Sequence, residues 1–199
     1  TNFANIQEIV SKYEKNYEEF KHFMILLSKM AQNYHRDTTF DNKIERILKT
    51  YKNSIKQSLS NLEIFKIFEK NKQILLFLIK EGIIIFDENI IKNIICKKYK
   101  DGTRLCHFFY TEIKSIVENE IIEIIKNELL KQNPNIFDKF EENRKIGQND
   151  SYICSLIRND SIIDFISHIN RLNISPNSYI QNSFFETNFF LLKAGWVIF

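Results

Sequence analysis

The sequence predicts an all-α fold of antiparallel helical hairpins in a solenoid-like stack, and three observations support this. Apolar residues recur at spacings of three and four along most of the 199-residue chain, the pattern of a helix facing a core. The chain has only 4 Gly and 2 Pro, whereas sandwiches and barrels need a turn about every 8 to 12 residues. A hydrophobic share of 44% is too high for a disordered chain.

The first long segment, from about residue 5 to residue 32, carries one apolar stripe and predicts a helix. Polar residues 33–39 interrupt the stripe, and we expect Asp41 to cap a second helix. These two helices form a predicted N-terminal hairpin over residues 1–58.

The central region, residues 59–147, predicts buried helices. Apolar residues between positions 59 and 80 occupy more than one helical face, which indicates a buried helix or a close pair of helices. Gly82 stands where a helix end uses a left-handed residue, and Asp87 is placed to cap the next helix. Four apolar residues, Ile83 to Phe86, lie between these signals, and we interpret them as a buried connector rather than a strand.

Further along this region, Asp101-Gly102 predicts a turn, followed by helix from Thr103 to Gln132 in one or two pieces. Pro134 ends that helix, because proline disfavours helical geometry at the residue before it. A short amphipathic piece then reaches Gly147.

The last region, residues 148–199, begins with two short helical patterns. One face carries Tyr152, Ile153, Leu156 and Ile157, and Asn159-Asp160 interrupts it. We expect Ser161 to start the next helix by accepting a hydrogen bond from an amide of its first turn. Two short antiparallel helices joined by a tight polar turn form the unit of helical solenoids. The three regions are expected to form one continuous helical domain.

Several runs of the sequence resemble those of a known family: Gln73 to Gly82, Ser151 to Cys154, Leu156 to Ser161, Phe185 to Asn188 and Phe190-Leu191. Residues 149–193 resemble the segment before the ankyrin array in a family of ankyrin-repeat proteins, with a domain of unknown function, expanded in parasitic protists. The likeness spans roughly residues 73 to 193 and is weak before residue 73. The resemblance implies that residues 148–199 form an ankyrin-like capping helix pair with a truncated apolar tail.

The chain departs from the family after Lys193. There the family continues into a first ankyrin helix, whereas this chain reads Ala194 to Phe199. We therefore expect either a truncated or frameshifted member without its array, or a local ending formed by the last six residues.

The resemblance and the apolar tail together predict a non-enzymatic protein–protein interaction module, the N-terminal cap or spacer of an ankyrin-repeat protein. An apolar patch that a neighbour normally covers is an interface. We expect an unidentified protein partner to contact such a patch, whose candidate residues are Phe184, Phe185, Phe189, Phe190 and Trp196.

Composition bears on other partners and on localisation. A formal net charge of +3 argues against a dedicated nucleic-acid binder, although an RNA-binding helical repeat using Lys97, Lys98 and Lys100 stays open. No uninterrupted apolar run approaches the roughly 18 to 20 residues of a membrane span. The acidic first twenty residues do not resemble a signal peptide, so we expect a cytoplasmic protein.

Two constellations could carry chemistry. Asp37 follows His35-Arg36 with the spacing of a kinase catalytic loop, but the chain has no glycine-rich loop and no Asp-Phe-Gly. His107 adjoins Cys106 and could join Cys96 and Cys154 in a metal or thiol site, but there is no Cys-x-x-Cys pair. We expect structural roles and no metal or cofactor; an enzyme using His107 or Asp37 is the alternative.

Overall fold

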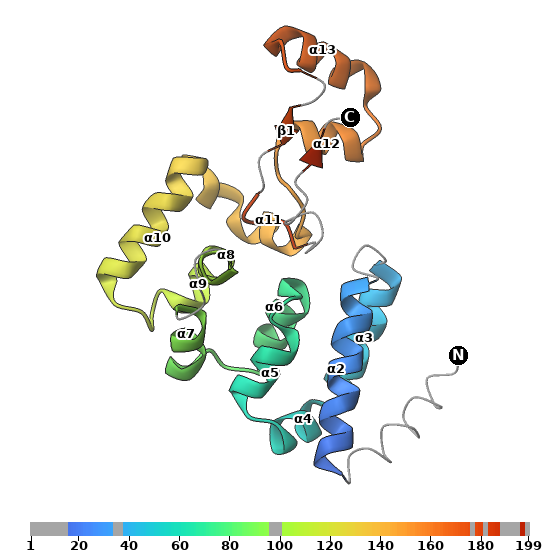
Figure 1. Cartoon of the computed structure of the whole chain (residues 1–199), viewed down its shortest axis with the longest axis vertical. Coiled ribbons are helices and arrows are strands. Elements are labelled where there is room, and N and C mark those ends of the chain that lie inside the picture. The colour runs from blue at the N-terminus through green and yellow to red at the C-terminus, as the bar shows by residue number, and fades with distance from the viewer. Residues whose placement is uncertain are drawn as a thin grey trace. The chain divides into compact units, whose positions relative to one another are not determined.

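The computed structural model describes residues 16–33, 38–95, 101–175, 178–180, 183–187 and 196–197, and most of them are helical (Figure 1). The predicted all-α class is therefore confirmed, while the solenoid-like stack and the three-part division stay predictions. The chain forms two compact units: residues 1–102 with 115–117, and residues 103–114 with 118–199.

The first unit is a set of packed helices. Helix α2 packs against α3 and α5, α3 also contacts α6, and α5 also contacts α6 and α7. Its core includes the fully buried Phe20, Phe65 and Phe68. Its helices are α2 (Tyr17–Asn33), α3 (Thr38–Thr50), α4 (Lys52–Ser58), α5 (Asn61–Phe68), α6 (Lys72–Lys80) and α7 (Glu88–Ile95).

The packing of α2 on α3 agrees with the predicted hairpin, but Asp41 is not its cap. Helix α3 already begins at Thr38, so Asp41 is the fourth residue of the helix. Acidic residues are common within a first turn, which makes the boundary ambiguous in sequence. The apolar stretch before residue 80 is a close pair of helices, α5 and α6, as one of the two alternatives predicted.

The connection between α6 and α7 confirms three predictions. Gly82 has φ +63° and follows the end of α6. The amide of Ile90 donates to Asp87 Oδ1 at 2.9 Å, so Asp87 caps α7. Between them, residues 83–86 form no strand; Ile83, Ile84 and Phe86 are buried as predicted, whereas Ile85 is 63% exposed.

The second unit is also mainly helical. Asp101-Gly102 is not a turn but the start of a helix, since an acidic residue and a small one are both compatible with a first helical turn. The helix predicted to end at Gln132 is in three pieces. In chain order the elements are α8 (Asp101–Phe108), α9 (Tyr110–Ile113), α10 (Asn119–Gln132), the 3-10 turn η1 (Ile136–Lys139), α11 (Phe140–Ile146), α12 (Tyr152–Arg158) and α13 (Ile162–Leu172).

Two predicted helix ends in this unit are confirmed. Asn133, directly before Pro134, is extended with φ −149° and ψ 109°, and it ends α10. Gly147 has φ +67° and ends α11. A short antiparallel pair, β1 (Tyr179–Ile180) and β2 (Trp196–Val197), was not predicted, because two-residue strands carry no periodic signal.

Candidate functional site

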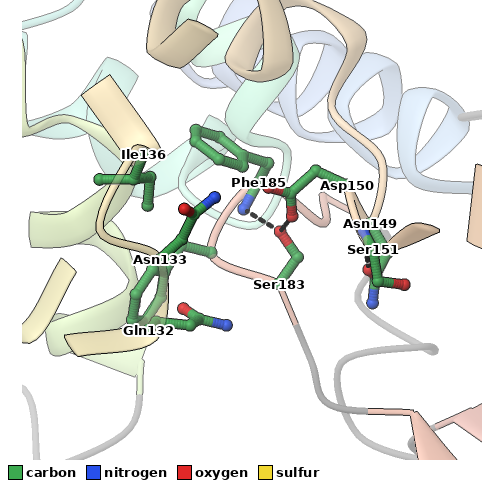
Figure 2. Close-up of a pocket in the computed structure, with 9 residues that line it drawn as sticks. Gln132, Asn133, Ile136, Asn149, Asp150, Ser151, Ser183 and Phe185 are labelled. Carbon is green, nitrogen blue, oxygen red and sulfur yellow. Dashed lines mark hydrogen bonds between the residues drawn. The ribbon is translucent and has the colours of Figure 1, made fainter. Parts of the chain in front are cut away.

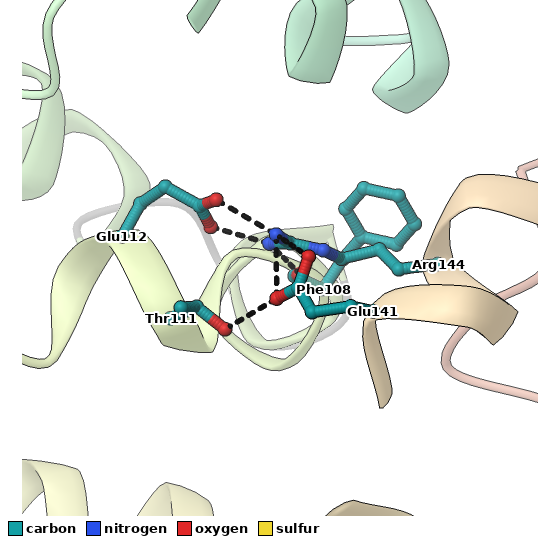
Figure 3. Close-up of polar contacts among 5 residues, drawn as sticks. All are labelled: Phe108, Thr111, Glu112, Glu141 and Arg144. Atoms are coloured by element: carbon teal, nitrogen blue, oxygen red, sulfur yellow. Dashed lines mark hydrogen bonds and ion pairs between the residues drawn. The ribbon is translucent and has the colours of Figure 1, made fainter. Parts of the chain in front are cut away.

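A buried arginine organises the second unit. Arg144 lies on α11 with its side chain 1% exposed. Its Nη1 donates to the Phe108 carbonyl oxygen at 3.1 Å, and its Nη2 donates to Glu112 Oε1 and Glu141 Oε2, both at 2.8 Å (Figure 3). The guanidinium carbon also lies 5.6 Å from the centre of the Phe140 ring. The guanidinium of Arg144 therefore links α8, α9 and α11.

The electrostatics of this cluster favour the charged state. Burial lowers the pKa of Arg144, but the hydrogen bonds and charges of Glu112 and Glu141 outweigh that effect, and the pKa is raised overall. The Thr111 hydroxyl donates a hydrogen bond to Glu141 Oε1 at 3.0 Å. The cluster therefore keeps a charged guanidinium in the interior of the second unit.

A polar pocket of about 210 Å³ lies in the same unit (Figure 2). The end of α10, the start of η1, the connection between α11 and α12, and the segment 183–187 form it. Its lining residues are Gln132, Asn133, Ile136, Asn149, Asp150, Ser151, Ser183, Phe184 and Phe185.

Hydrogen bonds fix the side of the pocket that Asp150 and Ser183 form. Ser183 Oγ donates to Asp150 Oδ1 at 2.6 Å and accepts from the amide of Phe185 at 3.1 Å. Beside the pocket, Thr187 Oγ1 donates to the carbonyl oxygen of Gly147 at 2.8 Å. These bonds join segment 183–187 to residues 147–150. These two segments, 33 to 40 residues apart in the sequence, are therefore neighbours in space.

The helix pair α12–α13 follows the pocket, and α12 packs against α13. The amide of Cys154 donates to Ser151 Oγ at 3.3 Å, which caps α12. Ser161 is the N-cap residue of α13, as predicted, but its hydroxyl accepts no cap bond, so that part of the prediction is wrong. The turn explains this, because Asp160 adopts φ +52° and Ser161 has ψ 66°, short of the extended geometry of Ser151.

Helix α13 buries little. None of its residues is fully buried, and Phe165 and Ile169 pack only partly, against the small cluster of Cys154 and Ile180. The exposed fractions of Ile162, Ile163 and Ile166 are 60%, 84% and 52%. We call these three residues the isoleucine face.

The residues predicted to form an apolar docking patch do not all do so. Phe185 is buried, 1% exposed, with its ring centre 5.3 Å from that of Phe140, so its predicted availability to a partner is wrong. Phe184 is half-buried and stacks on His107 at 4.2 Å. Trp196 lies in β2, where its backbone pairs with Ile180. Phe189 and Phe190 lie outside the described residues.

Of the residues considered for catalysis, the structure describes His107, Cys106 and Cys154. His107 is buried, with Nε2 2.8 Å from Glu128 Oε2. Burial, together with the charge of Glu128, raises the pKa of the Cys106 thiol to about 11, and burial also raises that of Cys154. Such thiols are poor nucleophiles at neutral pH.

Within the described part of the chain, no group of three or more His, Cys, Asp or Glu residues could hold a metal ion. Asp37, Cys96 and the lysine run 97–100 lie outside that part. Sequence reasoning missed Arg144 and Asp150; a Glu-x-x-Arg spacing on α11 was a signal for the first, whereas nothing marked the second.

Comparison of the chain with family models, with curated proteins and with solved structures gave no match. Among the described residues, no helix combines the length and the apolar character needed to cross a membrane.

Proposed function

We propose that this protein is a non-enzymatic protein–protein interaction module that caps an array of ankyrin-type helical repeats. The isoleucine face of α13 carries the proposal. Three isoleucines on a single helix are at least half exposed, and water is an unfavourable environment for them. A partner that covers this face would stabilise it.

The shape of the helix pair supports a repeat array as the partner. Helices α12 and α13 are joined by only three residues, 159–161, and pack on one another. Two short, packed helices with a tight connection are also the building unit of helical solenoids. In such arrays each helix pair is completed by the next one, so a cap needs one apolar face and one polar face.

The opposite side of α13 is polar, as a cap requires. Asp164 and Arg171 lie on the side of the helix away from Ile162 and Ile166, at the 100° step of an α-helix. His168 shares that side and contacts the ring of Tyr152, with centres 4.9 Å apart. A neighbour would therefore dock on one side of α13.

Binding in trans tests the proposal. The purified chain is titrated by calorimetry with an independently folded ankyrin array that lacks its N-terminal capping repeat. We expect binding, and we expect Ile163→Asp to weaken it about tenfold or more, because burying one isoleucine contributes about 1.5–3 kcal/mol.

The matched control is Ile124→Asp on α10, where the isoleucine is 59% exposed but lies outside α12 and α13. This variant should bind as the unchanged chain does. Circular dichroism establishes that both variants keep their helices. Absence of binding, or equal loss in the two variants, would contradict the proposal.

A further inference from the structure

The pocket beside Asp150 has a chemistry that docking on the isoleucine face does not use. Its volume, about 210 Å³, is below the roughly 300–1,000 Å³ of pockets for drug-sized ligands. A nucleotide or a large cofactor is therefore too big for it. A single side chain, or a small organic group of that size, fits.

The side chains that line the pocket determine which kind of chemical group it can bind. Ile136 and Phe185 supply apolar surface, and both are buried and so held in place. Three carboxamides and two hydroxyls supply polar surface. Asp150 is the one ionisable side chain in the lining, which is made of Gln132, Asn133, Ile136, Asn149, Asp150, Ser151, Ser183, Phe184 and Phe185.

Asp150 is exposed and only partly engaged. Its Oδ1 accepts from Ser183 Oγ at 2.6 Å, and within the described residues its Oδ2 makes no hydrogen bond. Ser183 is itself buried, so this bond fixes the carboxylate at the pocket wall. Figure 2 shows Asp150 and Ser183 on one side of the pocket and Gln132 and Asn133 on the other.

The lining of the pocket carries a negative charge at Asp150. Burial raises the pKa of the Cys154 thiol, and the charges of Asp150 and of the buried Glu186 raise it further. Arg158 opposes them, but its Nη1 is held by the carbonyl oxygen of Asn149 at 2.7 Å. Of the described residues that line the pocket, Asp150 alone is charged, and its carboxylate disfavours an anionic ligand.

We propose that this pocket binds a primary alkylammonium group, with Asp150 as its counter-ion and with Ile136 and Phe185 against its aliphatic stem. Side-chain oxygens of the polar wall accept the remaining N–H groups. The ammonium is either the side chain of a lysine in a protein or a free small amine. The assignment goes beyond docking on α13 and does not depend on it.

The test uses the full chain and amide chemical shifts measured by NMR. Titration with n-butylammonium should shift amides in residues 132–136, 149–151 and 183–185, and equal concentrations of neutral n-butanol should shift them much less. This comparison needs no variant. No shift with n-butylammonium, or equal shifts with both compounds, overturns the proposal.

Two variants locate the charge. Asp150→Asn keeps an oxygen for Ser183 but loses the charge, and it should weaken n-butylammonium binding about tenfold or more. Asp138→Asn, at an exposed carboxylate on η1 outside the pocket, should leave binding unchanged. Unchanged binding in Asp150→Asn overturns the proposal.

A second titration separates the two sources of the ammonium. A capped tripeptide with a central lysine is compared with n-butylammonium on the same amides. Tighter binding of the peptide assigns the pocket to a lysine of a protein partner. Equal or weaker binding assigns it to a free amine.

Discussion

At the scale of single residues, Arg144 shows how a charge can be kept inside this protein. Moving a guanidinium out of water is costly, and the cost is offset only when its donors and the partner carboxylates are well matched. Glu112 and Glu141 provide that match from two helices, and the rings of Phe108 and Phe140 cover the cation.

Removing this side chain should destabilise the second unit strongly. Arg144→Met leaves Glu112 with a partly buried, unpaired charge, so we expect a loss of about 3 kcal/mol in the free energy of unfolding. Urea denaturation followed by circular dichroism measures it. Lys145→Met, at the exposed neighbouring position, should change stability by less than about 0.5 kcal/mol. Similar losses in both variants would contradict the structural role of Arg144.

In the first unit, Glu63 should make stability depend on acid. Its carboxylate accepts from Lys21 Nζ at 2.7 Å, from the Tyr17 hydroxyl and from Ser60, and these bonds lower its pKa from 4.5 to about 2. Because the pKa is lower in the folded state, the stabilisation is complete above about pH 4.5. It is lost as the pH falls toward 2.

Unfolding midpoints in urea at pH 6 and pH 3 test this. Glu63→Gln should lose less stability than the unchanged chain between the two pH values. Glu88→Gln serves as the control, since Glu88 makes only an exposed pair with Lys92 at 3.8 Å. An identical acid response in the chain and in Glu63→Gln would show that Glu63 is not the titrating group.

The residue scale is also where the sequence was least informative. Arg144 reads as a surface residue by type, and Glu112 lies 32 positions away, so only the tertiary fold reveals their pairing. Phe185 was predicted to be exposed but is buried. An aromatic doublet in an irregular segment suggests an exposed patch, whereas the ring of Phe185 packs beside that of Phe140. Such long-range contacts have no periodic signature.

At the scale of elements, local chemistry predicted more. Gly82, Asp87, Pro134 and Gly147 mark helix boundaries because each acts through backbone geometry or a bond within a few residues. The predictions of a cap at Asp41 and of a turn at Asp101 were wrong, since an acidic residue suits both a cap and the first turn of a helix.

The caps of α12 and α13 give a matched pair of substitutions. Ser151→Ala removes the acceptor of the Cys154 amide and should cost about 1 kcal/mol. Ser161→Ala removes no cap bond and should cost less than about 0.5 kcal/mol. Denaturation in urea measures both. Equal losses would mean that Ser161 also caps its helix in solution.

Substitutions of Gly82 test whether the left-handed backbone at the end of α6 requires glycine. A methyl group there would lie 4.0 Å from Lys52 Nζ, so space is available, but φ +63° strains an L residue by about 1–2 kcal/mol. Gly82→Ala should therefore lose about that much stability. Gly82→Asn should lose less, because asparagine tolerates this conformation better. Thermal unfolding of the two variants ranks them, and the reverse order would contradict the assignment.

At the scale of the whole molecule, the two compact units should respond separately to core substitutions. Phe185 is buried in the second unit, so Phe185→Ala should cost about 3–5 kcal/mol there. Hydrogen exchange should show faster exchange in α10 to α12 and unchanged exchange in α2 to α6. Phe137→Ala, at a partly exposed ring in the same aromatic group, should cost less. Faster exchange in both units would show that they unfold as one.

The bonds from segment 183–187 back to residues 147–150 have a consequence for the order of folding. Helices form within about a microsecond from local contacts. The Ser183–Asp150 bond, by contrast, closes a loop of 33 residues, at an entropic cost near 3 kcal/mol beyond a constant. We therefore expect the helices to form first and the Asp150 pocket last, so that an early folding intermediate would have its helices but no place for a ligand.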